Sequence, residues 1–394
     1  MNQSSPQFAA ALSTSESWQD AASEVTNAVL QQVSASADLA FLFVSHHFKE
    51  DFAEIVAEVH QAIQCDNLIS CTGESIIGNS QEIENKPAIS LWVAHLPDVQ
   101  LSPMHLQFLQ NMDGGSFDGW NPDLPEQWPE DSTLLMIGEP FSFPADAILA
   151  RLNEDQPGVP VIGGMASGGH APNENLIALG SQVYNHGAVA VHIAGAIRIH
   201  SLVSQGCRPI GKPLVITKCE RNEIFELGGK PPLVQLQEIF DTLPVSDQKL
   251  VHQGLHVGRV IDEYRDQFEQ GDFLIRNVVG IDEKKGAIVV ADFMRPGQTV
   301  QFHIRDEKSA DAELQELLGK LKQQSANPAA ALIFTCNGRG TRLFSEPHHD
   351  ATCVANSCGE IPAAGFFAMG ELGPIGNKNF MHGFTASIAL FESK

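Results

Sequence analysis

Three glycine-containing turns combine flexible backbone with polar side chains, a pattern that suits binding of a small polar ligand. They lie at 72–74, 163–168 and 365–371, each at the end of a short apolar run that predicts a β-strand. Ligands of open α/β sheets bind outside the carboxyl ends of the strands, where glycine permits close approach of main-chain donors. Tight turns or close packing would also explain each glycine. The candidate ligand-binding residues are Thr72, Gly73, Glu74, Gly164, Met165, Ser167, Gly168, Gly370 and Glu371.

A fourth glycine-rich turn, at 337–340, adds Asn337, Gly338 and Arg339 to these candidates. Arginine presents a planar fork of N–H donors that can hold a carboxylate through two parallel hydrogen bonds. That carboxylate belongs either to a ligand or to one of the many acidic side chains of the chain itself. Both interpretations stay open at the level of sequence.

Cys71 and Cys336 lie close to these turns and raise the possibility of an enzyme with a cysteine nucleophile. The chain contains no G-x-S-x-G elbow, no complete G-x-x-x-x-G-K-[S/T] phosphate loop and no H-E-x-x-H motif. Small buried packing residues are the simpler interpretation of both cysteines. We therefore expect no enzyme and assign no catalytic residue.

The elements that position these turns recur three times along the chain. Each copy contains an apolar strand, a helix, a strand of small residues that ends near glycine, and another apolar strand. The copies are 39–45, 51–64, 68–74 and 88–96; then 132–139, 145–152, 159–168 and 187–195; then 330–337, 350–358, 361–370 and 383–391. Such a repeated order is a stronger signal than any single short apolar run.

The pattern within each copy predicts an α/β fold of mixed sheets covered by helices. In the first helix Phe52, Ile55, Val56, Val59 and Ile63 recur at helical spacing, so one face is buried. The flanking strands are almost continuously apolar, as strands covered on both faces must be. A strand, a helix and a second strand in this order give parallel neighbours. The fourth element predicts a further strand, antiparallel to these, and hence repeated β-α-β-β units.

An insert of different character, 198–327, separates the second copy from the third. Its part from 273 to 305 alternates strand-like runs with turns and predicts an inserted antiparallel meander. The first 24 residues, rich in Ser, Gln and Ala, are expected to form a mobile tail. We expect an N-terminal domain at 25–245 and a C-terminal domain at 246–394, divided near a proline and polar residues.

The charge of the chain excludes several classes of partner. Asp and Glu number 48 against 24 Lys and Arg, which gives a formal charge of -24. Nucleic acids and anionic membranes both require clustered cationic side chains, so neither is expected. The seven cysteines are odd in number and contain no C-x-x-C pair. A reducing cytoplasm is therefore the expected location.

Several short sequence motifs together resemble those of the FIST family. In the C-terminal half they occupy 332–340, 361–376 and 381–386, and in the N-terminal half 69–74, 161–168 and 208–211. The resemblance covers about residues 25–391. It implies a ligand-sensing module of bacterial signal transduction, which in eukaryotes occurs beside an F-box. Because this chain contains no F-box, kinase or cyclase segment, it resembles a stand-alone sensor that acts through a separate protein.

Some similar bacterial proteins bind haem, sense nitric oxide and control a histidine kinase or diguanylate cyclase. Among the 15 histidines, His192 and His170 are the candidate haem ligands. His192 lies within an apolar strand where similar proteins usually have an apolar or small residue, and His170 directly follows the second glycine turn. A core histidine bonded to a backbone group is the alternative for each.

The sequence thus predicts a sensory protein that binds a small ligand, or haem as a cofactor, and regulates a separate histidine kinase or diguanylate cyclase. An enzyme with a cysteine nucleophile and a ligand-free interaction scaffold are the two alternatives.

Overall fold

The chain folds into two compact units. The computed structural model describes residues 5–110, 114–265, 267–268, 271–324 and 326–394. The first unit combines Met1–Ser204 with Gln315–Lys394, and the second is Gln205–Leu314. The boundary expected near residue 245 lies inside the second unit. The second unit is therefore an insertion in the first. Its residues, 205–314, lie within the insert expected at 198–327.

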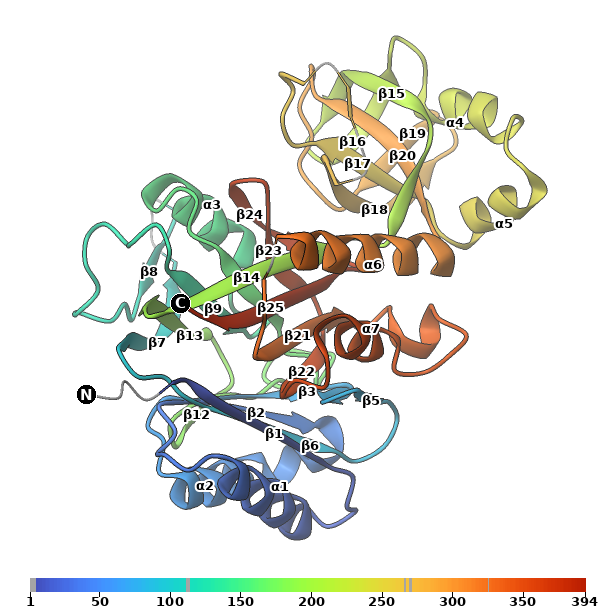
Figure 1. Cartoon of the computed structure of the whole chain (residues 1–394). Coiled ribbons are helices and arrows are strands. Elements are labelled where there is room, and N and C mark those ends of the chain that lie inside the picture. The colour runs from blue at the N-terminus through green and yellow to red at the C-terminus, as the bar shows by residue number, and fades with distance from the viewer. Residues whose placement is uncertain (1–4, 111–113, 266, 269–270, 325) are drawn as a thin grey trace. The chain divides into compact units, whose positions relative to one another are not determined.

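The three predicted β-α-β-β copies are present in the first unit (Figure 1). The first contains β2 (Leu39–Ser45), α2 (Phe52–Ile63), β3 (Leu68–Gly73) and β6 (Ile89–His95). The second contains β9 (Thr133–Gly138), α3 (Ala145–Asp155), β10 (Val161–Met165) and β13 (Ala188–Gly195). The third contains β21 (Ala330–Cys336), α7 (His349–Cys358), β22 (Ala363–Ala368) and β25 (Ala386–Ser393).

Strand pairing within each copy agrees with the prediction. The strands on either side of the helix are parallel in all three copies, as the pairs β2 with β3, β9 with β10 and β21 with β22 show. The fourth strand pairs antiparallel with the first, as β6 does with β2, β13 with β9 and β25 with β21. The mixed α/β fold class is therefore confirmed.

A hairpin after the third strand of each copy was not expected from the sequence, and it joins the sheet of another copy. The three hairpins are β4 (Ile76–Gly78) with β5 (Gln81–Ile83), β11 (Ile177–Leu179) with β12 (Gln182–Tyr184), and β23 (Glu371–Ile375) with β24 (Lys378–His382). Strand β4 pairs with β22, β11 with β3, and β23 with β10. Each copy thus completes the sheet of a different copy in a closed cycle.

The other edge of each sheet gains a strand that precedes or follows a copy. These strands are β1 (Gln7–Ser13) beside β6, β7 (Val99–Leu109) with β8 (Ser116–Asp118) beside β13, and β14 (Ile197–Ser204) beside β25. The mobile tail expected at residues 1–24 is therefore wrong from residue 7 onward. Residues 7–13 form β1, and α1 (Trp18–Gln32) begins where Ser17 accepts a hydrogen bond from the Asp20 amide, while residues 1–4 lie outside the described residues.

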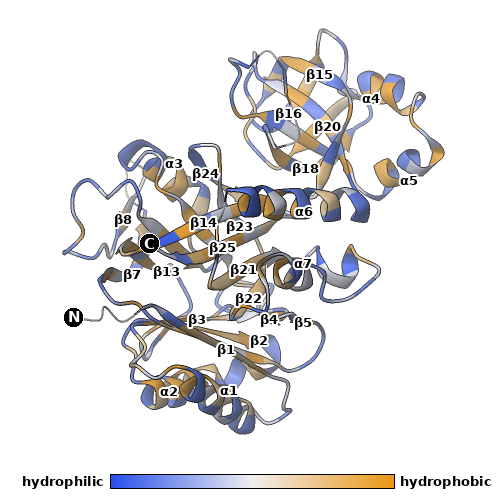
Figure 2. Ribbon diagram, viewed as in Figure 1, coloured by the Kyte–Doolittle hydropathy of each residue, from blue (hydrophilic) through white to orange (hydrophobic). Residues whose placement is uncertain are grey.

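The three sheets share one central apolar core. Phe43 from the first, Ile137 from the second and Phe334 from the third all belong to it, with Phe43 and Phe334 ring centroids 6.4 Å apart. The outer face of the first sheet packs against α1 and α2, and that of the second against α3. Figure 2 shows strands coloured mainly hydrophobic and helices with a hydrophilic side. Strands covered on both faces explain the continuous apolar runs in the sequence.

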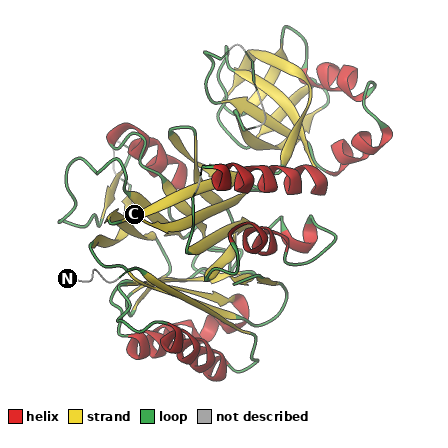
Figure 3. Cartoon of the chain, in the orientation of Figure 1, coloured by secondary structure: helices red, strands yellow, loops and turns green. Residues whose placement is uncertain are grey.

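The second unit is a closed antiparallel barrel with two helices (Figure 3). Its elements are β15 (Cys207–Glu220), β16 (Glu223–Leu227), α4 (Pro232–Phe240), α5 (Val245–Gln253), β17 (His256–Val260), β18 (Phe273–Asp282), β19 (Ala287–Val290) and β20 (Thr299–Arg305); α6 (Glu307–Gln323) follows. The expected meander is present only between β18 and β19. Strand β20 pairs with β15 and β17 instead, because closure leaves no exposed sheet edge.

Two glycines at corresponding positions of the second and third copies lie against backbone of the neighbouring strand. A methyl carbon added at Gly163 would lie 1.9 Å from the Met136 carbonyl oxygen, and one at Gly365 would lie 1.8 Å from the Ile333 carbonyl oxygen. Neither oxygen can move without breaking the parallel pairing. These glycines are therefore required by the strand packing.

We predict that Gly365→Ala destabilises the protein by about 3 kcal/mol or more, since the new methyl group overlaps backbone. Gly319→Ala is the matched control. Gly319 lies in α6 with no atom near its added carbon, and removing a helical glycine stabilises by about 0.5–1 kcal/mol. Urea unfolding followed by tryptophan fluorescence measures both. Equal stabilities of the two variants would contradict the packing role of Gly365.

Candidate functional site

The three glycine turns meet within the first unit. The Ser167 amide donates to the Thr72 carbonyl oxygen at 3.1 Å, and the Ser167 hydroxyl accepts from the Glu74 amide at 2.9 Å and donates to the Phe367 carbonyl. The Met165 amide donates to the Gly370 carbonyl at 2.8 Å. The structure therefore brings the turns together, and their polar groups bond mainly to one another.

The glycines in these turns permit close packing. A methyl carbon added at Gly168 would lie 2.5 Å from Cβ of Thr72, and one at Gly164 would lie 2.8 Å from Cβ of Ala368. Thr72 and Ser167 are both buried. In this conformation the glycines therefore allow close packing of the turns, which was the alternative to ligand binding.

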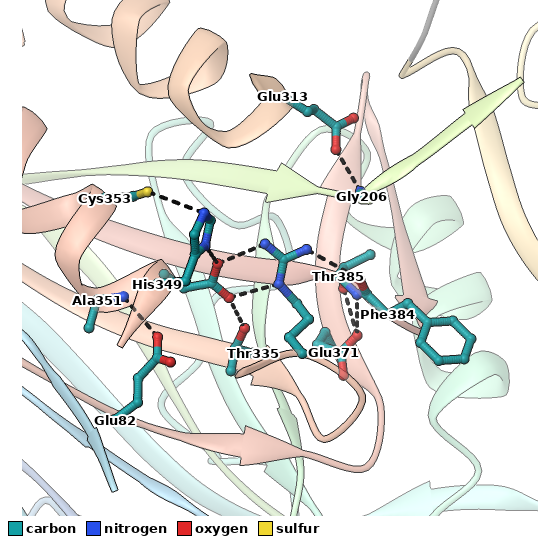
Figure 4. A network of polar contacts seen from close by, with 12 residues as sticks. Glu82, Gly206, Glu313, Thr335, His349, Ala351, Cys353, Glu371, Phe384 and Thr385 are labelled. Atoms are coloured by element: carbon teal, nitrogen blue, oxygen red, sulfur yellow. Dashed lines mark hydrogen bonds and ion pairs between the residues drawn. The ribbon is translucent and has the colours of Figure 1, made fainter. Parts of the chain in front are cut away.

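The third copy differs from the other two because it buries an ion pair beside its glycine turn (Figure 4). Arg339 follows β21 and Asp350 lies in the first turn of α7, and both side chains are almost fully buried. The Arg339 Nε and Nη2 atoms donate to the two Asp350 carboxylate oxygens, each at 2.7 Å. The sequence left open whether Arg339 binds a carboxylate of a ligand or of the protein. In the structure it binds the protein's own Asp350.

Further donors converge on Asp350. The Thr335 hydroxyl donates to Oδ2, and His349 Nδ1 lies 2.9 Å from Oδ1. Burial alone would raise the pKa of Asp350, but the charge of Arg339 and these hydrogen bonds hold that pKa well below its usual range. Asp350 is therefore a carboxylate at neutral pH. Removing either partner of such a buried pair leaves an uncompensated charge.

Acidic residues from the first copy contact both helix α7 and the loop that carries Arg339. Glu82 accepts from the Ala351 amide at 3.0 Å. Glu84 accepts from the Thr341 amide at 2.9 Å and from its hydroxyl at 2.8 Å. Glu74, one of the predicted ligand-binding residues, instead forms an ion pair with Arg342. Because hairpin β4–β5 pairs with β22, the first copy reaches the charged site of the third.

A second buried carboxyl group, Glu371, lies at the start of β23. Its Oε2 atom accepts from the Thr385 amide at 3.0 Å and hydroxyl at 2.6 Å, and the Cys336 thiol also bonds to the carboxyl group. Within the described structure its Oε1 atom has no hydrogen-bond partner. Burial raises the pKa of Glu371 to about 8. Glu371 is consequently protonated for the most part at neutral pH.

Two more acceptor atoms in this region lack partners in the described part of the chain: Glu82 Oε2 and Asn337 Oδ1. Burial and then the charge of Asp350 raise the pKa of Glu82 to about 8. Native proteins leave few buried polar atoms without partners. We define the candidate site as Glu82, Asn337, Arg339, Asp350 and Glu371.

The two candidate haem ligands differ in environment. His170 is exposed in the loop after β10. His192 is buried in β13 with its ring 4.6 Å from that of Trp128, and its Nε2 atom has no partner among the described residues. Burial lowers the pKa of His192 to about 4, so its imidazole is neutral. His192 therefore has the protonation state that iron ligation requires.

The two cysteines considered as nucleophiles are poorly placed for that role. Cys71 is fully buried in the central core, and burial raises its pKa well above the ordinary value. Cys336 bonds to the Glu371 carboxyl group and accepts a weak hydrogen bond from the Gly338 amide at 3.4 Å. Neither contact activates a thiol.

Sequence reasoning identified Arg339, Asn337 and Glu371 but missed Asp350 and Glu82. Asp350 was assigned only to a helix, and Glu82 lies in a hairpin that the pattern did not indicate. A buried arginine needs a carboxylate partner, which was the available signal. The sequence offers 48 acidic residues for that role, so the partner could not be chosen.

Comparison with known proteins identifies the family. A FIST N domain matches residues 38–230, and a FIST C domain matches residues 234–374. The chain belongs to the FIST family, whose domains are sensory signal-transduction domains that bind small ligands and relay signals. The boundary between the two matched domains, at residues 230–234, lies close to the boundary expected near residue 245. The first compact unit, in contrast, contains parts of both matched domains.

Two mycobacterial proteins show how far the similarity extends. The "Uncharacterized protein Rv0628c" of Mycobacterium tuberculosis is 38% identical over 354 residues, which cover 90% of this chain and 91% of that protein. The "Uncharacterized protein Mb0898c" of Mycobacterium bovis is 37% identical, with 90% of each chain covered. No helix within the described residues has both the length and the apolar character to cross a membrane.

We predict that Arg339→Met destabilises the protein by about 3–5 kcal/mol, because it leaves the Asp350 carboxylate buried without its counter-ion. The matched control is Arg151→Met. Arg151 pairs with Asp155 at 3.0 Å, but both side chains are about half exposed (53% and 54%), so we expect a loss below about 0.5 kcal/mol. Urea unfolding measures both, and similar losses would contradict the importance of the buried pair.

Proposed function

We propose that this protein is a sensor that binds a small polar ligand at the candidate site and acts through a separate histidine kinase or diguanylate cyclase. The observation that carries the proposal is the group of buried oxygen atoms around one ion pair that lack hydrogen-bond partners in the described part of the chain. Glu82 Oε2, Asn337 Oδ1 and Glu371 Oε1 are all of this kind. Unpaired buried acceptors cost free energy, which a ligand with hydrogen-bond donors would recover.

The charges favour a ligand with an ammonium group. Arg339 is already bonded to Asp350 through two nitrogens, so a ligand carboxylate is not required by that guanidinium. Glu371 and Glu82 are instead carboxyl groups whose ionisation burial opposes. A cation beside either group would replace its proton. The preferred ligand is therefore a small primary amine or an amino acid that enters with its amino group first.

Signal output follows from the closure of this site. Glu371 is fully buried and Glu82 is 3% exposed, so a ligand reaches them only in a more open arrangement. Opening would break the contacts from Glu84 to Thr341 and from Glu74 to Arg342. A ligand that binds the open arrangement more tightly shifts the population toward it. The partner protein would recognise the loop that these contacts hold.

We predict that at least one member of a panel of primary amines and amino acids stabilises the protein against heat, by about 2.7 kcal/mol at one hundred times its dissociation constant. Glu371→Gln should weaken its binding at least tenfold, because a neutral amide cannot pair with an ammonium group. Since the pKa of Glu371 is about 8, affinity should rise as pH rises from 6 toward 8. Calorimetric titration measures both effects.

The control is Glu346→Gln, an exposed carboxylate in the same loop region, which should leave affinity unchanged. Equal loss in both variants, or equal affinity of Glu371→Gln and the unaltered protein, would contradict the proposed site.

Haem sensing of nitric oxide is a second candidate, favoured by His192. A buried, neutral imidazole with no partner for Nε2 in the described structure has the donor chemistry of an axial ligand. Trp120 and Trp128 pack against the same apolar cluster on the outer face of the second sheet and would contribute the apolar surroundings. Bound haem would supply an iron that binds nitric oxide. His170, which is exposed, fits this role less well.

If haem is the ligand, protein produced with ample iron and haem precursor will show a stoichiometric Soret band that shifts with nitric oxide. His192→Ala should abolish the band, and His170→Ala should retain it. A protein that stays colourless after addition of hemin would rule out haem and leave the amine proposal intact.

A further inference from the structure

Helix α7 carries a cysteine and a histidine on one face. His349 and Cys353 are four residues apart, so their side chains are neighbours on the helix surface. The Cys353 Sγ atom lies 3.8 Å from His349 Nε2 (Figure 4). The His349 side chain is 14% exposed and Cys353 is half-buried. The sulfur is thus both partly accessible and within contact of a ring nitrogen.

The other side of the histidine ring is held in place. His349 Nδ1 lies 2.9 Å from Asp350 Oδ1, and the ring stacks on Phe344 with centroids 3.5 Å apart and planes inclined by 8°. Asp350 is itself fixed by Arg339. This chain of contacts orients Nε2 toward the sulfur. The third group in such a chain fixes the ring, as in known nucleophile–base–acid arrangements.

The charge state of His349 suits a role beside a thiolate. Burial by itself would lower its pKa, but the hydrogen bonds to Asp350 and Cys353 and their charges raise that pKa to about 10. The imidazole is therefore protonated at neutral pH. An imidazolium next to a sulfur stabilises the thiolate, which is the nucleophilic form of cysteine.

From this geometry we infer that Cys353 is a reactive thiol, activated by His349 and positioned through Asp350, and that it is a site of oxidation by peroxides. This inference is independent of the proposed amine and haem ligands. It makes α7 a second route by which a chemical signal reaches the ion pair of Asp350 and Arg339.

The oxidation balances as follows. The Cys353 thiolate attacks one oxygen of the peroxide, so that an S–O bond forms and the O–O bond breaks. The cysteine is oxidised by two electrons to a sulfenic acid, and the peroxide is reduced. The departing hydroxide takes the proton from the His349 imidazolium and leaves as water. The step leaves no thiolate beside His349, and the imidazole, with a pKa of about 10, then takes up a proton from solvent.

Among the described residues, the other cysteines differ from Cys353 in burial or in the groups around them, and burial raises the pKa of the partly exposed Cys219. Cys65, Cys71 and Cys207 are buried. Burial raises the pKa of Cys358, which lies on the same helix and is also half-buried. Cys358, where burial outweighs the charge of Lys322, is therefore a reference thiol on α7 for which the described structure records no histidine contact.

The test is peptide mapping by mass spectrometry after brief treatment of the intact protein with iodoacetamide or with hydrogen peroxide and dimedone. We expect Cys353 to be alkylated at least tenfold faster than Cys358, and sulfenic acid to be trapped at Cys353. His349→Gln should lower the rate at Cys353 at least tenfold and leave the rate at Cys358 unchanged.

Equal rates at Cys353 and Cys358 in the unaltered protein would overturn the inference, whether or not the His349→Gln variant folds. A fast Cys353 that is unaffected in a folded His349→Gln variant would overturn the role of the histidine. Amine binding is measured separately in Cys353→Ser, so failure of either proposal is recognised without the other.

Discussion

The structure of the first unit depends on the need of every sheet edge for hydrogen-bonding partners. A buried strand edge leaves backbone N–H and C=O groups without partners, which is costly. Each β-α-β-β copy leaves such an edge at its third strand, and the hairpin of another copy occupies it. Because the exchange is cyclic, the three sheets enclose one apolar core. No copy has a complete sheet without the hairpin of another copy.

This exchange also determines where the site can form. The hairpin of the first copy pairs with β22, so Glu82 and Glu84 reach a loop and a helix of the third copy. Three near-equivalent turns therefore become chemically different. At the central turns the glycines and hydroxyls satisfy one another, whereas the third copy buries one arginine with three carboxyl groups, Glu82, Asp350 and Glu371. Because these charged groups are buried, the stability of this region depends on which of them carry a charge and which have partners.

The main elements were predictable because their signals are local. The helix α2 has an apolar face at helical spacing, and β2, β9 and β21 are continuously apolar, so the three copies and their strand directions follow from the sequence. The short hairpins and β1 were missed, because three to seven residues with mixed burial give no clear period. The site was predicted in part: Arg339 and Glu371 stand out beside glycines, but their partners are distant in sequence.

The sequence by itself determined the repeated unit, the mixed α/β class, the insertion and the family, since each is written in local pattern or in motif order. Only the tertiary structure decided which of 48 acidic residues pairs with Arg339. It also decided that the hairpins exchange between copies and that Cys353 lies beside His349. These outcomes depend on contacts between distant segments and on burial, which sets the cost of each unpaired charge. A local sequence pattern specifies neither the contacts between distant segments nor the burial of each side chain.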